Sequence, residues 1–419
     1  MKFFTLYTIA VCFSVSLFAQ RNCGTSDYWQ QQLSADPVLA QRYSQINIAS
    51  EKRLQISNKE QGNDINDQMV ITIPVVVHIL YNNTAENITD AQVQSQIDVL
   101  NKDFSKGNDD IGKVPAAFAP FAADCKIKFQ LASADPSGFS TNGIVRVKTA
   151  QTSWKQDDKM KYTMNGGDDA WDSRYYLNIW VCNLSHSLLG YGTFPGAVKE
   201  KDGVVIRTDV FGTIGNNSSA YNKGRTTTHE VGHWLNLKHL WGDADCGDDN
   251  VDDTPRQKTY NTGCSSFPKI TPGGCNNNPA GDMFMNFMDF SDDACIIMFT
   301  NGQKSRMRDL FSAAGARATI VASTGLSKPW NEYTNTDSAS SVPGNIIAYP
   351  NPAITDISFK NNKGIAIIAD MYAVYDVKGK LLMQGYNRST ITINRLTPGI
   401  YFIKMQYGER QRVLRFLKQ

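Results

Sequence analysis

The sequence predicts an α+β protein in two parts, a mixed α/β domain with a twisted sheet and a small all-β sandwich after it. Residues 71–80, ITIPVVVHIL, form a continuous β-branched run typical of a buried strand, and residues 88–104 then show helical spacing. Further strand patterns at 126–132 and 177–182 complete an alternation that is typical of a mixed α/β domain. From residue 346 onward, short alternating runs separated by turn residues indicate a β-sandwich.

Length and charge limit the alternatives. The chain has 419 residues, and single cores stop growing near roughly 250–300 residues, so two or three domains are expected. Its 42 basic and 40 acidic side chains leave a formal charge of +2, which argues against an electrostatic nucleic-acid binder. The meaning of the eight cysteines depends on the compartment in which the protein works.

The N-terminus predicts export. Lys2 precedes a mostly apolar stretch, and Ala19 is a small residue suited to cleavage, so residues 1–19 are a predicted signal peptide. The alternative is a membrane anchor, but four polar residues interrupt the stretch. No later run approaches the roughly 20 apolar residues that span a bilayer. We therefore expect an exported protein with no stable membrane span, in which disulfides are permitted.

Two polar segments separate the remaining parts of the chain. Residues 20–66 contain one helical stretch around 36–54 but have too few apolar residues to form a core. Residues 324–345 have the composition of a linker. The predicted segments are the signal peptide at 1–19, a polar N-terminal segment at 20–65, the mixed α/β domain at 66–323, the linker at 324–345 and the β-sandwich at 346–419. The predicted strands of the last part are 354–359, 369–375, 380–383, 389–393, 399–405 and 412–416.

The candidate metal-binding and catalytic residues lie in residues 226–243, TTTHEVGHWLNLKHLWGD. His229 and His233 are four residues apart, so on a helix both imidazoles project from one face and can hold one metal ion. Glu230 lies beside them, placed to touch a metal-bound water without being a ligand. His239 reaches the same ion only if the chain turns back. Three neutral imidazoles plus water make an open catalytic zinc site rather than a closed structural one.

A fortuitous HExxH match is the alternative, because this short pattern often occurs by chance. A third histidine follows in a chain that has only five, which favours a metal site. The remaining two histidines, His78 in the first predicted strand and His186, are expected to be structural.

The segment HEVGHWLNLKH resembles the long zinc motif of the metzincins and, more narrowly, that of the pappalysin family in its secreted bacterial and archaeal branch. Supporting stretches are IPVVVHILYN at 73–82, LNIWVCNL at 177–184, LLGYGTFPG at 188–196, VDDTP at 251–255 and NFMDF at 286–290. The resemblance covers residues 66–312. It implies a metzincin-type catalytic domain, with a mixed sheet and a zinc-binding active-site helix, that hydrolyses peptide bonds in proteins.

The resemblance also implies roles for individual residues. The three histidines would bind zinc, Glu230 would act as the general base, and Met288 would pack beneath the site as the Met-turn. Residues 188–193 resemble the edge strand that pairs with an extended substrate. Asp292 and Asp293 follow the Met-turn closely and could make the S1′ pocket favour Arg or Lys, or they could be surface residues or calcium ligands.

Two departures from the family pattern stand out. The family usually has Gly where the zinc helix ends, whereas this chain has Asn236; Asn tolerates the left-handed conformation better than other non-Gly residues, so we expect the turn to form. Family members commonly place Tyr two residues after the Met-turn methionine, where its phenol can assist the oxyanion. Here that residue is Phe290, and we expect a reduced rate rather than loss of activity.

Five Asp fall within residues 245–253, DCGDDNVDD. Crowded carboxylates are unfavourable unless a hard cation binds among them, although a solvated acidic loop is the common alternative. The resemblance implies calcium in this region, and the candidate ligands are Asp248, Asp249, Asp253 and the carbonyl of Thr254.

Four cysteines after the zinc segment permit three pairings. The resemblance implies Cys246 with Cys275 and Cys264 with Cys295. Cys125 and Cys182 either form a third bridge or remain buried thiols.

Cys23, within RNCGT, resembles the cysteine switch of metzincin zymogens, in which a thiolate occupies the open zinc position. The alternative is an unpaired thiol in a disordered tail. The switch makes residues 20–65 a propeptide that must be cut before Ile71. The candidate cleavage sites, if the enzyme cuts at basic residues, are Lys52, Arg53 and Lys59.

The C-terminal part resembles the sorting domain of the Bacteroidetes type IX secretion system. The stretches that carry this resemblance are YPNP at 349–352, DVKGKLL at 376–382, LTPGIYFIKM at 396–405 and the final RFLKQ. It implies recognition by the outer-membrane secretion machinery and a secreted or cell-surface product. A carbohydrate-binding or adhesive sandwich is the alternative.

Taken together, these features predict a secreted zinc endopeptidase that is made as a latent zymogen, acts on proteins or peptides, and has a preference for Arg or Lys at P1′ if the acidic pair lines that pocket. One alternative is an adhesin or binding module with a structural zinc site. Another is a catalytically weakened relative, for which Phe290 is the only supporting observation.

Overall fold

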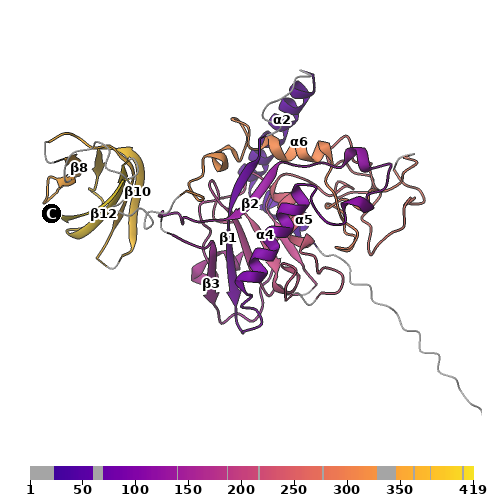
Figure 1. The fold of residues 1–419 in the computed structure, drawn as a ribbon, viewed down its shortest axis with the longest axis horizontal. Coiled ribbons are helices and arrows are strands. Elements are labelled where there is room, and N and C mark those ends of the chain that lie inside the picture. Colours follow the sequence, from indigo (N-terminus) through magenta and orange to yellow (C-terminus); the bar gives the residue numbers. More distant parts are fainter. Residues whose placement is uncertain are drawn as a thin grey trace, which may run out of the picture.

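The computed structural model describes residues 23–59, 69–327 and 346–419, apart from short gaps at 139, 186, 216–217, 276–277, 362–363, 378 and 408–409. The predicted signal peptide and His186 lie outside these residues. The described chain contains a six-stranded sheet with its helices and, after residue 346, a separate set of strands (Figure 1). None of the described helices is long and apolar enough to cross a membrane.

The larger sheet is mixed, as predicted. Its strand order is β2–β1–β4–β6–β5, and β3 also pairs with β1. All neighbouring strands are parallel except β5, which runs antiparallel to β6 at the edge. The strands are β1 (Ile71–Tyr81), β2 (Ile127–Leu131), β3 (Ile144–Lys148), β4 (Leu177–Cys182), β5 (Gly190–Gly192) and β6 (Val204–Arg207). The three strands expected from the sequence pattern are confirmed, and the edge strand that the resemblance implied at 188–193 is β5, whereas β3 and β6 were not predicted.

β1 is an interior strand of the sheet, and it is apolar on both faces. Ile73, Val75 and Val77 are fully buried in the main core, whereas Val76 and Leu80 enter separate clusters on the other face. The first half of β1 pairs with β2 and the second half with β3. This long strand therefore ties two shorter ones into the sheet.

Two helices cover the main core. The predicted helix at 88–104 is α4 (Asp90–Phe104), and the Thr89 side chain caps it by accepting the Gln92 N–H. It packs against α5 (Arg225–Trp234), the helix that carries HEVGH (Figure 1). Side chains of both helices, including Val93, Ile97 and Val231, enter the core beneath them.

A buried ionic cluster fixes the start of α5. The Arg225 guanidinium donates two hydrogen bonds to Asp110, at 2.6 and 2.8 Å, and one to the Asp293 carbonyl at 2.6 Å. The Asp293 carboxylate accepts the backbone N–H groups of Lys223 and Arg225. Asp103 accepts the Thr228 hydroxyl, and burial, partly offset by Arg225, raises its pKa to about 7. These contacts join α4, α5 and two loops.

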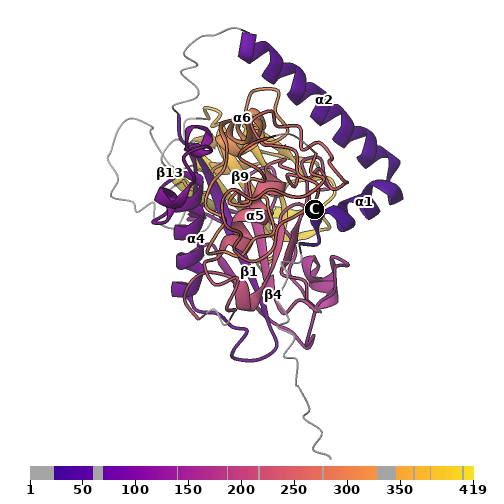
Figure 2. The same ribbon diagram turned by 90° about the vertical axis from the view of Figure 1, so that its right-hand side faces the viewer.

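The N-terminal segment departs from the prediction of a single helix around 36–54. It forms α1 (Thr25–Ala35) and α2 (Pro37–Lys59), which lie along one side of the larger unit (Figure 2). α1 contacts β5, and α2 contacts α6 (Asn301–Asp309). Arg53 of α2 pairs with Asp309 through two bonds of 2.6 Å. The segment has no core of its own but buries Tyr28 and Trp29 in a cluster with the sheet.

The C-terminal strands form two antiparallel sheets, β10–β9–β12–β13 and β11–β8–β7. Buried residues of both sheets, such as Phe359 and Ile403, share one apolar cluster, which is the arrangement of a sandwich. Each of the six predicted runs overlaps a strand. The strands are β7 (Ile346–Tyr349), β8 (Asp356–Asn361), β9 (Ala369–Tyr375), β10 (Leu381–Arg388), β11 (Thr390–Thr392), β12 (Gly399–Tyr407) and β13 (Arg410–Lys418).

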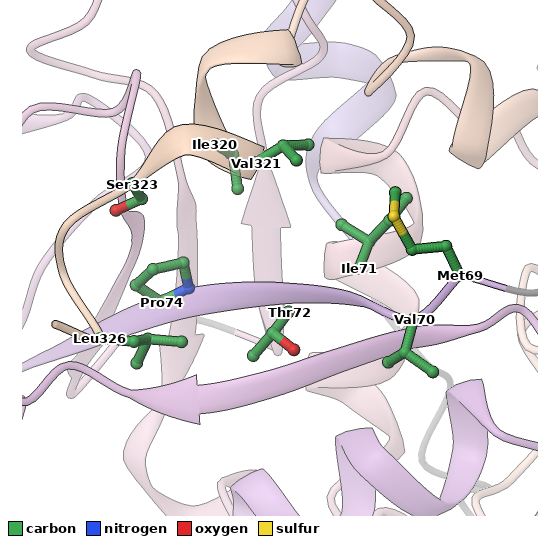
Figure 3. A pocket seen from close by; sticks show the side chains of 9 residues that line it. All are labelled: Met69, Val70, Ile71, Thr72, Pro74, Ile320, Val321, Ser323 and Leu326. Atoms are coloured by element: carbon green, nitrogen blue, oxygen red, sulfur yellow. The ribbon is translucent and has the colours of Figure 1, made fainter. Parts of the chain in front are cut away.

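A cavity of about 270 Å³ lies at the start of β1 (Figure 3). Its walls come from the first residues of that strand, including Ile71 and Pro74, and from residues 320–326. None of the residues predicted to bind metal or to act in catalysis lines it, so this cavity is not the predicted site.

The Arg225 cluster makes a prediction about stability. Replacing Arg225 with Met leaves Asp103 buried without its cation and leaves Asp110 with only the partly exposed Lys223, at 3.1 Å. We expect the free energy of unfolding to fall by about 3–5 kcal/mol in urea denaturation. The matched control is Lys102→Met, because Lys102 and its partner Asp109 are largely exposed and should contribute little. Equal losses in the two variants would contradict this role for the buried cluster.

Candidate active site

α5 and the turn after it place three histidines together. His229 and His233 lie one helical turn apart and are fully buried. Asn236 then adopts the left-handed conformation, with a φ of 71°, and the Leu237 N–H donates to a carbonyl in the last turn of the helix at 2.9 Å. The turn predicted at Asn236 is therefore present, and it returns the chain so that His239 faces the helix.

The Nε2 atoms of the three histidines converge on one point. The distances are 3.2 Å from His229 to His233, 3.2 Å from His229 to His239, and 3.1 Å from His233 to His239. Zinc–nitrogen bonds of about 2.0–2.1 Å at tetrahedral angles place ligand nitrogens about 3.3–3.4 Å apart. The spacing of the three nitrogens is close to that of a tetrahedral zinc site.

The other ring nitrogens determine the tautomers. Each Nδ1 faces an oxygen that can only accept: the Phe287 carbonyl at 2.7 Å for His229, the Leu237 carbonyl at 2.8 Å for His233, and the Asp243 carboxylate at 2.5 Å for His239. Each Nδ1 therefore carries the proton, and each Nε2 presents a lone pair to the other two. Three lone pairs at this distance repel one another unless a cation lies between them, so the residues fit zinc.

Burial and neighbouring groups shift the pKa values of two members of this cluster, His233 and Asp243. Burial, and then the neighbouring His239, lower the pKa of His233 to about 3, so its imidazole is neutral. Burial alone would raise the pKa of Asp243. The neighbouring His239 and hydrogen bonds from His239 and Ser26 outweigh that effect and lower the pKa to about 2. Asp243 is thus an anion that orients His239.

Glu230 belongs to α5 itself, and Met288 packs against this helix at Gly232. Glu230 is almost fully buried, and its Oε2 accepts a 2.7 Å hydrogen bond from the Thr25 hydroxyl. Met288 is fully buried, with its sulfur so close to Gly232 that an added Cβ there would come within 2.5 Å of it. The glycine in HEVGH therefore allows the methionine to pack directly against the helix.

The Cys23 thiol faces the same point. Its Sγ lies 3.5 Å from His233 Nε2 and 3.5 Å from Glu230 Oε2, and the potential ligand atoms of Cys23 and the three histidines all lie within 4.8 Å of one another. The Gly24 N–H donates to the Gly190 carbonyl of β5 at 2.9 Å. Burial, and then the Glu230 carboxylate, raise the pKa of the thiol well above its usual value, so a thiolate there requires a cation.

Phe290 packs against the histidines. Its ring centroid lies 4.9 Å from that of His239, 5.7 Å from that of His229 and 4.9 Å from that of Trp241. Trp241 in turn stacks on His239 at 4.4 Å. The residue that replaces the family tyrosine is therefore at the site, and the expected reduction in rate stays a prediction.

The two predicted disulfides are confirmed. Cys246 pairs with Cys275, and Cys264 pairs with Cys295. Cys125 and Cys182 are fully buried free thiols in two different apolar clusters, so they do not form the third bridge that the sequence left open.

The candidate calcium ligands make other contacts. Asp248 accepts from Arg256 at 2.8 Å, and Asp249 accepts the Thr254 hydroxyl at 2.8 Å. Asp253 accepts a hydroxyl and a backbone N–H at the start of α6. Within the described ranges, these carboxylates do not come together as a group that could hold an ion. Calcium binding by this loop stays a prediction.

The acidic pair after the Met-turn separates into two roles. The Asp293 carboxylate is fully buried and is used to hold the start of α5. Asp292 is only partly buried, and its N–H donates to the Gly263 carbonyl at 2.9 Å. Of the two, only Asp292 is partly exposed.

His78 has the structural role expected of it. It is fully buried in β1, and its ring nitrogens lie 2.6 Å from Asp168 and 3.0 Å from Asn178. Both nitrogens are therefore taken up by fixed partners.

Sequence reasoning missed three residues of the site. Thr25 and Ser26 follow the switch-like Cys23, and their hydroxyls contact Glu230 and His239. The third residue is Asp243, at the end of the segment 226–243. A carboxylate four residues after a metal-binding histidine was the signal for it, because such histidines generally donate their second N–H to an oxygen.

Comparisons with known proteins agree with this geometry. Residues 161–312 match the peptidase family model described as pregnancy-associated plasma protein-A, and residues 347–419 match the secretion system C-terminal sorting domain. An extracellular metalloprotease of Arthroderma otae is 31% identical over 255 residues, which cover 58% of this chain and 78% of that protein.

Two solved structures are also similar. Mature mirolysin of Tannerella forsythia, in complex with a cleaved peptide, is 49% identical with a TM-score of 0.60, over 62% of this chain and all of that one. A promirolysin mutant of the same organism is 44% identical with a TM-score of 0.64, over 74% of this chain and all of that one.

The contact between Asp243 and His239 makes a prediction about metal affinity. Asp243→Asn removes the anion that orients His239, and we expect the affinity for zinc to fall by about 10–100-fold in a competition titration with a chelator. Asp245→Asn is the matched control, since Asp245 is exposed and contacts none of the three histidines in the described structure. An unchanged affinity for Asp243→Asn would show that the imidazole is held by other groups.

Proposed function

This chain belongs to the pregnancy-associated plasma protein-A family of metallopeptidases, the pappalysins, and we propose that His229, His233 and His239 hold its catalytic zinc while Glu230 acts as general base. The observation that carries this assignment is the convergence of three unprotonated Nε2 atoms beside a buried carboxylate. The enzyme is a metalloendopeptidase, and its C-terminal sorting domain directs export by the type IX secretion system.

The residues divide the work of peptide hydrolysis. The three histidines would hold a zinc ion, which when bound would supply a Lewis acid for activating water and polarising the scissile carbonyl. Glu230 takes a proton from the attacking water at a carboxylate oxygen and delivers it to the leaving amine. Asp243 keeps the His239 ring oriented, and Met288 supports the helix from below.

The edge strand β5 is the proposed binding site for an extended substrate. The Gly190 carbonyl and the Gly192 N–H point away from β6, and in the precursor they bond to Gly24 and to the Thr25 hydroxyl. A substrate backbone can form the same kind of hydrogen bonds after these groups leave. The N-terminal segment therefore covers the place that a substrate needs.

Cys23 is the proposed zinc ligand of the latent form. Its sulfur lies near the point at which the three Nε2 atoms converge, and a thiolate there would occupy the coordination position that water needs for catalysis. Residues 20–65 then form the propeptide, and cleavage before Ile71 activates the enzyme.

An adhesin with a structural zinc site is a weaker candidate. A structural site is closed by four protein ligands and has no use for a carboxylate beside an open position. Glu230 is such a carboxylate. Calcium in the 245–253 loop remains part of the proposal on the family resemblance alone.

The role of Glu230 can be tested by substitution. In Glu230→Ala we expect peptidase turnover to fall by at least about 10²–10⁴-fold, because no group remains to move the proton, while one zinc per chain is retained. The measurements are cleavage of a quenched peptide and zinc content after identical activation with trypsin. Glu200→Ala, at an exposed position, is the control and should change neither quantity. Full turnover with normal zinc in Glu230→Ala would sink the assignment.

We also propose that Asp292 gives the S1′ pocket a preference for Arg or Lys. It follows Phe290 by two residues, and Phe290 contacts two of the histidines. A partly exposed ion pair contributes up to about 1 kcal/mol, so Asp292→Asn should lower kcat/KM for P1′ Arg relative to P1′ Leu by about fivefold. Matched peptides that differ only at P1′ measure this, with Asp252→Asn as an exposed control. An unaltered ratio of kcat/KM for P1′ Arg to P1′ Leu in the Asp292 variant would show that Asp292 does not line the S1′ pocket.

A further inference from the structure

Tyr28 of α1 occupies a slot in the catalytic domain. The side chain is 2% exposed, its hydroxyl donates to Asp158 at 2.8 Å, and its ring lies 4.9 Å from the ring of Tyr191 in β5. None of the groups that hold Tyr28 is one of the three histidines or Glu230. This contact is therefore separate from the contact between Cys23 and the proposed zinc site.

The catalytic domain forms the slot from its own residues. Asp158, at 2% exposure, pairs with Lys161 at 3.0 Å and Lys201 at 3.3 Å, and accepts the Tyr191 hydroxyl at 3.2 Å. The fully buried Lys161 ammonium also donates to the Lys201 carbonyl at 2.8 Å. Each of these contacts lies within the catalytic domain, so groups other than Tyr28 hold the acceptor in the slot. The Lys201 ammonium also donates to Gln32 of α1 at 3.2 Å.

The slot is suited to a phenol. The Lys161 ammonium lies 5.6 Å from the Tyr28 ring centroid, 5.3 Å from that of Trp180 and 5.1 Å from that of Tyr191, which is cation–π distance. Burial would raise the pKa of Asp158, but Lys161, Lys201 and the hydrogen bond from Tyr28 together outweigh it and lower the pKa, so the acceptor is a carboxylate. A hydroxyl that donates to a buried carboxylate forms one of the stronger hydrogen bonds in proteins.

A second aromatic group extends the contact toward the active site. Trp29 and Tyr43 of the N-terminal segment lie 5.6 and 5.5 Å from Phe194, and Phe194 lies 5.4 Å from His233. The segment is thus held over several residues by aromatic packing that needs no metal.

We propose that Asp158, Lys161 and Tyr191 form a tyrosine-binding slot that retains the N-terminal segment 23–59 independently of zinc. The excised segment then rebinds the mature enzyme through Tyr28 and inhibits it in trans by covering β5. The inhibition rests on the proposed function, whereas the binding does not.

A labelled synthetic peptide of residues 23–59 tests the slot. Its Cys23→Ser form is titrated by fluorescence anisotropy against mature enzyme, purified after activation of the full chain, with chelator present. We expect saturable binding, because the slot needs no metal. The Tyr28→Phe form should bind about 10–100-fold more weakly, since it lacks only the hydroxyl. The matched control is Gln31→Ala, at an exposed position of α1, and should bind like the parent peptide.

An enzyme variant completes a double-mutant cycle. Asp158→Asn should weaken binding of the parent peptide and remove most of its advantage over the Tyr28→Phe form. Absence of binding by the Cys23→Ser peptide, or equal affinity of the peptides with and without the Tyr28 hydroxyl for the wild-type enzyme, would overturn the proposal, and neither result depends on how Asp158→Asn folds. A separate assay of inhibition uses zinc-loaded enzyme. Loss of peptidase activity in that assay before any peptide is added would count against the proposed function and leave the binding result intact.

Discussion

The site depends on holding three imidazole nitrogens within 3.2 Å of one another with their lone pairs facing inward. Such an arrangement is repulsive without a cation, so the rest of the domain must impose it. The spacing of α5 sets two rings, the left-handed Asn236 returns the third, and oxygen acceptors on every Nδ1 prevent the rings from rotating. Gly232 then allows Met288 to pack against the helix from below.

Much of this could be predicted from the sequence because the determinants are local. The four-residue spacing of His229 and His233, the turn at Asn236 and the β-branched run of β1 each act within a few residues. The two disulfide pairings came from resemblance rather than from spacing, since four cysteines alone leave three pairings open.

The parts that could not be predicted are contacts between distant segments. Arg225 binds Asp110 on a loop more than a hundred residues earlier in the chain. No sequence pattern around either residue indicates this pairing. α1 was missed because it is a polar helix with two buried aromatic residues, and these are buried only because the catalytic domain presents the matching surface. The burial of Asp293 could not be predicted either, because its carboxylate accepts backbone N–H groups, which every non-proline residue has.

The short edge strand β5 also bears on the life of the protein before activation. A sheet edge with free backbone groups is a template on which other chains can pair, and proteins usually protect such edges. In the precursor, Gly24 and Thr25 already satisfy the outer groups of β5. The segment that we propose as the inhibitor therefore also shields this edge from pairing with other chains.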